Sequence, residues 1–182
     1  MTNLTRARDV DPLEPLPRPS FGICTKGVIH SENLPHRAEG VVHDGTPGGP
    51  YQHYSRATNC GRLIRAPPGY VVRLTFTEFE LRDADDYLRV YDGGSTFAPR
   101  IGAFDGFDDV SDGTLYSTGS EMLLHFHAAP LPTFLVEYDP VTGQALPPPP
   151  PPPPPVHAGF SAEYKFVRSS ELQQINITIA GE

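Results

Sequence analysis

The sequence of 182 residues has no tryptophan, only two cysteines and few basic side chains. Its 14 lysines and arginines are outnumbered by 22 acidic residues, which gives a formal net charge of −8 at pH 7. Nucleic acids and anionic membrane surfaces bind clustered Lys and Arg, whereas the basic residues of this chain are scattered. We therefore expect no nucleic-acid partner.

Long apolar runs are also absent. No stretch of about 18 apolar residues could form a transmembrane helix, so we expect no membrane insertion. Residues 1–20 lack the apolar core of a secretory signal peptide. Three explanations for the missing signal peptide stay open. The export signal was removed or lies elsewhere, the chain is a fragment of a larger protein, or the protein is not secreted.

Proline and glycine, in contrast, are abundant, with 22 and 17 residues. The prolines between residues 12 and 19 predict an extended leader over residues 1–20. Nine consecutive prolines, Pro147–Pro155, have no amide hydrogen and predict a polyproline II rod of about 28 Å, at about 3.1 Å per residue. The chain length and this composition favour one domain with tails and long loops.

Four stretches of the chain alternate apolar and polar side chains with the two-residue period of a strand that buries one face. In the most regular stretch, residues 72–77, the apolar Val, Leu and Phe alternate with Arg and two Thr. A turn of two prolines and a glycine precedes it, which excludes a helix at this point. The other three stretches are residues 87–91, 122–128 and 160–166. The sequence therefore predicts an all-β domain.

Six pieces of the chain, taken in order, resemble a CUB domain. They are GICTKGVIHSENLP at 22–35, Cys60, the strand-forming region 64–94, RIGAFDG at 100–106, MLLHFHA at 122–128 and GFSAEY at 159–164. The CUB family is an extracellular β-sandwich used mostly for protein and glycan recognition. The resemblance implies an all-β, antiparallel two-sheet, jelly-roll-like β-sandwich over residues 21–166.

Compared with the family pattern, the chain carries inserted loops near residues 37–58 and 129–157, and the second loop contains the proline run. Residues 167–182 form a C-terminal tail in which Gln173–Ala180 alternates as an additional strand would. A strand of this kind needs a partner, which is either the sandwich or another chain or domain. We therefore expect assembly contacts at exposed strand edges or at the polyproline loop.

The resemblance implies a disulfide between Cys24 and Cys60, whereas two buried thiols in a cytosolic protein are the alternative. The second disulfide of the family is missing, because one of its positions is acidic and the other is Asp105. Arg62 stands where the family usually has an aromatic residue, so local packing must differ from the family norm. Leu63 or Ile64 can then supply the inward face of this strand.

Many CUB domains bind calcium through a Glu and two Asp. In this sequence the Glu position falls on or near Arg82, Asp86 retains the first Asp, and Ala129 replaces the second. Asp83 or Asp85 could substitute for the lost Glu, so Asp83 and Asp86 are the candidate ligands of a degenerate calcium site. The interpretation that we favour is an acidic hairpin facing water, with no cofactor.

Histidines offer two other candidate metal sites. His43 and His53 lie in the first inserted loop, without a Cys or carboxylate pair at ligand spacing. His125 and His127 are two residues apart on a predicted strand, where they could hold a transition metal. We expect His125 and His127 instead to point outward as ordinary exposed residues.

We expect no enzyme, since no motif of a nucleophile, catalytic metal or phosphate loop is present. The leading hypothesis is a non-catalytic extracellular binding or structural module that contacts protein or glycan, in a glycoprotein matrix or surface assembly. Asn3 and Asn176 lie in sequons for N-glycosylation. The alternatives are an intracellular adaptor that presents polyproline to profilin, SH3 or WW partners, and an accessory domain of a larger secreted protease or receptor.

Overall fold

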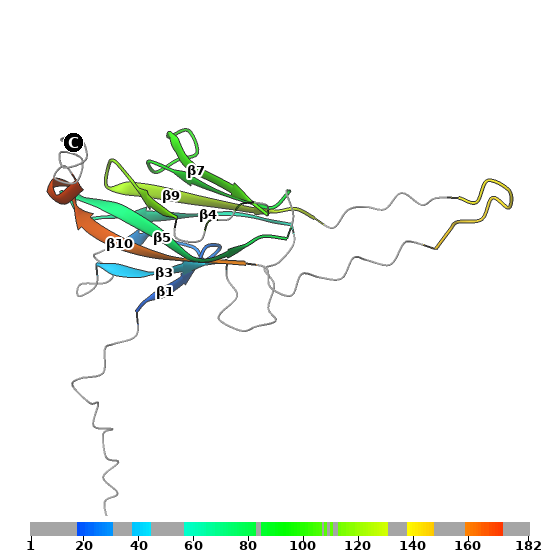
Figure 1. The fold of residues 1–182 in the computed structure, drawn as a ribbon, viewed down its shortest axis with the longest axis horizontal. Helices are drawn as coiled ribbons and strands as arrows, with labels where there is room; N and C mark the ends of the chain where they lie inside the picture. The colour runs from blue at the N-terminus through cyan, green and yellow to red at the C-terminus, as the bar shows by residue number, and fades with distance from the viewer. Residues whose placement is uncertain are drawn as a thin grey trace, which may run out of the picture.

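The alternating stretches form strands of two stacked sheets, seen as two layers in Figure 1. The structure is a computed structural model that describes residues 18–30, 38–44, 57–82, 85–106, 108, 110, 113–130, 138–147 and 159–172. One sheet has the order β1 (Ser20–Gly22), β3 (Glu39–His43), β10 (Gly159–Arg168), β5 (Tyr70–Glu80), β8 (Thr114–Tyr116). The other has the order β2 (Ile29–His30), β4 (Thr58–Arg65), β9 (Glu121–Ala128), β6 (Tyr87–Tyr91), β7 (Arg100–Asp105).

The hydrophobic core lies between the two sheets. Every second residue of β9 points inward, and Met122, Leu124 and Phe126 have no exposed surface. Across the core, Phe160, Ala162, Tyr164 and Phe166 of β10 are buried in the same alternation. The apolar alternation therefore defines the buried faces, as the sequence predicts for a sandwich.

β10 lies in the middle of its sheet, between β3 and β5, although more than twenty residues separate it from β9 along the chain. Its central residue, Tyr164, is paired with Gly40 of β3 and with Leu74 of β5. The Tyr164 ring covers Gly40 so closely that a Cβ at this position would lie 2.5 Å from the tyrosine oxygen. Glycine is therefore required at position 40.

Two edge pairs depart from the antiparallel sandwich that the resemblance implies. β1 runs parallel to β3, and β2 runs parallel to β4, whereas the other strand pairs are antiparallel. The short connection after β1, over residues 23–28, carries the chain from the edge of one sheet to the edge of the other, so β1 and β2 do not form a hairpin. Each sheet is consequently mixed, with one parallel pair at its edge.

The end of the predicted leader belongs to the first sheet. β1 begins at Ser20, the carbonyl oxygen of Pro19 accepts a hydrogen bond from Val41, and Arg18 forms an ion pair with Glu163 of β10. After β10, residues 169–172 form one helical turn. None of the helical residues that the structure describes belongs to a segment long and apolar enough to cross a membrane.

Several predictions fall on residues outside the described ranges. They concern leader residues 1–17, Asn3, His53, Asp83, most of the second inserted loop including residues 148–155, the predicted strand at 173–180, and Asn176. Within the second loop, residues 138–147 are described, and Tyr138 pairs with Ala145 in an antiparallel bridge. The carboxylate of Asp139 accepts hydrogen bonds from the backbone N–H groups of Val141 and Thr142 and closes this turn.

Candidate functional site

The connection between β5 and β6 contains a buried ion pair. Nε of Arg82 lies 3.1 Å from Oδ2 of Asp86, and the two side chains are 7% and 0% exposed. Oδ1 of Asp86 accepts a hydrogen bond of 2.6 Å from the backbone N–H of Ala129, just after β9. The fold thus brings together Arg82, Asp86 and Ala129, the three positions at which the resemblance places calcium ligands.

The interpretation of an acidic hairpin facing water is wrong at Asp86. A carboxylate can be buried when a cation and hydrogen-bond donors compensate for its lost hydration. Arg82 and the Ala129 N–H provide this compensation. The charge of Asp86 is therefore used inside the domain and not on its surface.

These residues do not fit a calcium ion. Calcium takes six to eight oxygen ligands, whereas a guanidinium and a methyl group occupy two of the three family positions here. Both oxygens of Asp86 also accept N–H donors already. Among the residues that the structure describes, no group of three or more His, Cys, Asp or Glu side chains could hold a metal ion.

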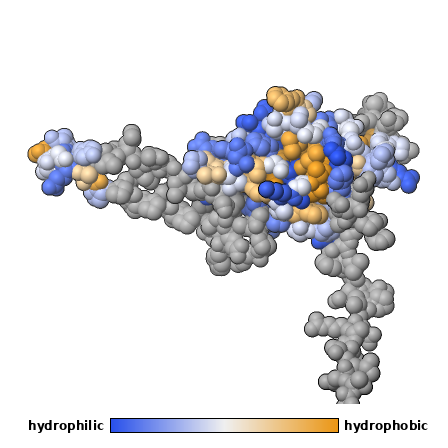
Figure 2. Space-filling view, turned by 180° about the vertical axis from the view of Figure 1, so that it is seen from behind, coloured by the Kyte–Doolittle hydropathy of each residue, from blue (hydrophilic) through white to orange (hydrophobic). Residues whose placement is uncertain are grey.

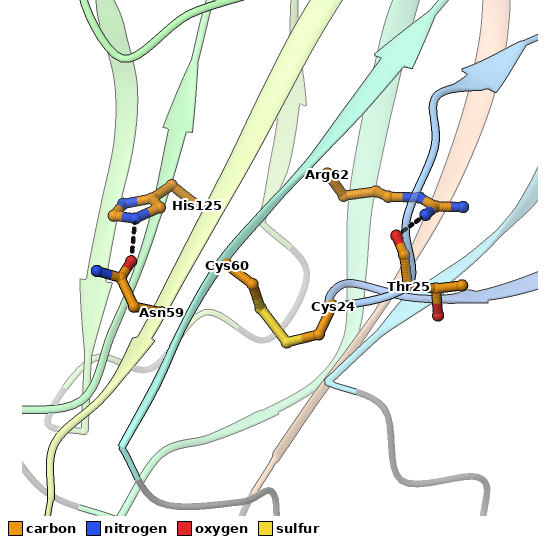
Figure 3. The surroundings of a disulfide bond; sticks show 6 residues. All are labelled: Cys24, Thr25, Asn59, Cys60, Arg62 and His125. Atoms are coloured by element: carbon orange, nitrogen blue, oxygen red, sulfur yellow. Dashed lines mark hydrogen bonds between the residues drawn. A yellow bond between two sulfur atoms is a disulfide. The ribbon is translucent and has the colours of Figure 1, made fainter.

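Beside the edge strand β2 of the second sheet, Cys24 and Cys60 of β4 form a disulfide with a Cα–Cα distance of 5.3 Å. It joins the segment after β1 to β4. Figure 3 shows Arg62 beside this bridge, with its guanidinium directed at the backbone carbonyl of Thr25, to which it donates a hydrogen bond. The disulfide and Arg62 together fix the connection between β1 and β2 against β4.

Arg62 is buried, with 3% of its surface exposed, and Ile64 rather than Leu63 continues the inward face. The guanidinium lies over the ring of Phe21, 5.4 Å from its centroid, a cation–π contact. Burial lowers the pKa of Arg62, and burial raises the pKa of the nearby Tyr164 to about 12. Arg62 therefore fills the position of the family's aromatic residue. Its alkyl chain is buried there, and its guanidinium stacks on the Phe21 ring.

The outer face of the second sheet carries the two histidines of β9, as the alternation predicts. His125 Nε2 is hydrogen-bonded to Oδ1 of Asn59 on β4 at 2.7 Å. The His127 ring stacks on Tyr87 of β6, with centroids 4.9 Å apart and planes 20° apart. The Arg89 guanidinium covers Tyr87 at 4.0 Å from the ring centroid.

Sequence reasoning did not find the stack of Arg89, Tyr87 and His127. The signal was present in part, because Tyr87 and Arg89 alternate with buried Leu88 and Val90 and so share one face. The register of β6 against β9, which pairs Tyr87 with His127 and Arg89 with His125, cannot be inferred from either strand alone. His43 lies on β3, and no described residue joins it in a metal site.

Comparison with known proteins agrees with this architecture. The family model of the CUB domain matches residues 26–130. Tolloid-like protein 2 from Homo sapiens is 37% identical over 78 residues, which are 41% of this chain and 8% of that protein. Procollagen C-endopeptidase enhancer 1 from Homo sapiens is 38% identical over 88 residues, which are 44% of this chain and 19% of that protein.

Two solved structures have the same fold at low sequence identity. The full extracellular region of zebrafish Gpr126/Adgrg6 matches 81% of this chain and 15% of that chain, with a TM-score of 0.50 and 22% identity. The CUB1-EGF-CUB2 domain of human MASP-1/3 matches 76% of this chain and 44% of that chain, with a TM-score of 0.50 and 20% identity. This chain therefore spans less than half of the length of each of these four proteins.

Proposed function

Because the chain belongs to the CUB domain family, we propose that it is a non-catalytic module that binds a protein partner in the extracellular space. The observation that carries this proposal is the agreement of the family match over residues 26–130 with the two-sheet sandwich. The extracellular region of Gpr126/Adgrg6, which has this fold, supports the location. The Cys24–Cys60 disulfide supports it as well, because disulfides persist in oxidising compartments.

The mode of recognition proposed here does not use calcium. Asp86 is paired with Arg82 within the domain, so its carboxylate is not available as a calcium ligand through which a partner could be bound. Recognition would instead use side chains on the sheet faces and loops. A role in a glycoprotein matrix, with glycans as additional partners, is a finer proposal that rests on the sequons at Asn3 and Asn176 and on the proline run.

A second candidate is an accessory domain of a larger secreted protease or receptor. This candidate is supported by how little of each relative the match covers, which is 8% of Tolloid-like protein 2 and 19% of procollagen C-endopeptidase enhancer 1. Catalysis would then lie in another part of that protein. The module itself would bind and position a partner in both cases.

Intact-mass measurement of the protein from its natural source, with and without reductant, tests the extracellular proposal. We expect a mass deficit of two hydrogens that disappears on reduction, and sugar at one or both of the sequon asparagines. A fully reduced protein without sugar would instead support the intracellular adaptor that presents its polyproline run. A longer polypeptide containing this segment would identify the accessory-domain form.

A further inference from the structure

The outer face of β4, β9 and β6 carries a preorganised cationic stack. Tyr87 contacts the Arg89 guanidinium, 4.0 Å from its ring centroid, and also the stacked His127 ring. These two contacts hold Tyr87 in place and hold Arg89 against it. The side chain that would contact a ligand is therefore ordered before binding, which reduces the entropy lost on association.

Arg89 has no ion pair and no hydrogen bond among the residues that the structure describes, and its guanidinium covers the Tyr87 ring. The other basic residues with outward positions on this sheet include Arg65, which is paired with Glu121 at 2.7 Å. Among the described residues Arg73 of β5 and Arg100 of β7 also lack an ion pair, and Arg89 differs from them in the aromatic ring that its guanidinium covers. The planar guanidinium of Arg89 can bind a carboxylate through two parallel N–H···O hydrogen bonds.

The neighbouring strands determine what else an anion would meet on this face. Opposite Arg89, β9 presents His125 and β7 presents Ala103. The nearest acidic residue in register is Asp105 of β7, opposite Tyr87, and it has interactions of its own. On β4, Asn59 and Gly61 carry no charge. The direct neighbours of Arg89 in register, His125 and Ala103, are therefore not acidic, and the acidic Asp105 lies one pair further along β7.

An apolar row crosses the same face beside the stack. Leu63, Leu123 and Tyr91 are paired in register across β4, β9 and β6, on the outward side of each strand. Leu63 and Leu123 remain partly exposed. Figure 2, which views the molecule from behind, shows that the surface of the domain carries hydrophobic patches among hydrophilic regions. Aliphatic rows of this kind pack against protein side chains, whereas glycans offer little apolar surface to them.

We propose that this face, defined by Arg89, Tyr87, His127, Leu63 and Leu123, binds an acidic segment of a protein partner, with a carboxylate on Arg89 and an adjacent apolar side chain on the leucines. The inference rests on the proposed binding function and names the surface and the partner chemistry. A second copy of this chain is disfavoured as the occupant, because two molecules of net charge −8 repel each other.

A displayed library of random peptides, selected on the full-length immobilised protein, tests the proposal. We expect enriched peptides that carry Asp or Glu next to Leu, Ile or Phe. Replacing the acidic residue of a selected peptide by its amide should weaken its Kd about tenfold or more, the loss expected for one charge-assisted contact. Enriched peptides without acidic residues would overturn the proposal.

Matched variants locate the contact. Arg89→Gln and Leu63→Ser should each weaken the Kd of a selected peptide about tenfold. Arg73→Gln is the control, since Arg73 of β5 lies on the outer face of the other sheet and should leave the Kd unchanged. Thermal unfolding of every variant checks that the fold is retained. Equal binding by the Arg89 and Arg73 variants would overturn the proposal but leave the general binding function intact.

A heparin oligosaccharide, measured by the same assay, serves as the glycan probe. The proposal would be overturned in favour of an anionic glycan if the selection yields no peptide, while heparin binds the natural protein and does not bind Arg89→Gln. Failure of the proposed extracellular function would be seen in a different measurement, the intact mass of the natural protein, which would then show reduced cysteines and no sugar. The two failures are therefore distinguishable.

Discussion

The Arg82 guanidinium lies 3.1 Å from the Asp86 carboxylate, and the interior of the domain shields both groups from water. The pair links the end of β5 to the start of β6. The backbone of Ala129 adds a third element, because its N–H donates to the other oxygen of Asp86. A single charge pair thus ties two consecutive strands of different sheets to the end of β9.

Removing one member of this pair should be strongly destabilising. Arg82→Ala leaves a buried carboxylate without its guanidinium partner, and we expect the free energy of unfolding to fall by about 3–5 kcal/mol. The double variant Arg82→Met/Asp86→Leu should cost much less, since no buried charge remains. Urea denaturation measures both. The control is Arg65→Ala, whose pair with Glu121 is partly exposed and should be worth about 0–1 kcal/mol.

Calcium should not stabilise the natural protein. Its melting temperature should be the same with millimolar calcium and with EDTA, because Arg82 and Ala129 replace two of the family's oxygen ligands. In Arg82→Glu/Ala129→Asp we expect a lower melting temperature in EDTA and a recovery with calcium. Calcium-dependent melting of the unmodified chain would contradict the assignment of Arg82 as the cation at this position.

The disulfide should contribute several kcal/mol. Cys24 and Cys60 are 36 positions apart, and closing a loop of this size stabilises the fold by about 4 kcal/mol in the chain-entropy model. Replacing both cysteines by serine should therefore lower the free energy of unfolding by this amount in urea. Treatment of the natural protein with a reductant should give a similar loss, and treatment of the double-serine variant should give none.

Tyr164 should make the fold sensitive to alkali. Burial raises its pKa to about 12, whereas an unfolded tyrosine has a pKa of about 10. The unfolded chain therefore loses this proton first, so the contribution of Tyr164 to stability is present below pH 10 and is lost as the pH rises from about 10 toward 12. Stability measured against pH should show this decline, and spectrophotometric titration should show one late tyrosine.

Tyr164→Phe is the matched variant for this effect. The phenolic oxygen is buried without a hydrogen-bond partner among the described residues, so its removal should raise the free energy of unfolding at neutral pH by up to about 1 kcal/mol. The late tyrosine should disappear from the titration. A marked loss of stability at neutral pH would show instead that the hydroxyl has a structural role.

His125 should make the fold sensitive to acid. Burial, and then the positive charges of Arg89 and His127, lower the pKa of His125 below its usual value of about 6.5. The unfolded chain therefore gains the proton first, and stability decreases as the pH falls below about 6.5. NMR titration of the ring should give the lowered pKa. His125→Gln should remove this part of the acid dependence, and an unchanged pH profile would contradict it.

The sequence determined the fold class through the alternation of buried and outward residues. Strands such as Tyr70–Glu80 and Glu121–Ala128 have one apolar side, and two such layers can bury these sides only against each other. The same alternation placed His125 and His127 on the outside. The family resemblance added the order of the pieces and the cysteine pair, which alternation alone cannot provide.

Tertiary structure decided which charges are inside. Between Cys60 and Arg65 the alternation allows either Leu63 or Ile64 to face inward, and only the packing of β4 against Phe21 and Thr25 shows that Arg62 and Ile64 do. Asp86 is similarly ambiguous within an acidic turn. Its burial depends on Arg82 and on the Ala129 backbone, which belongs to a distant segment. The two-residue period shows on which face of a strand a residue lies. The environment of a charged side chain, in contrast, depends on residues from distant segments that folding brings together.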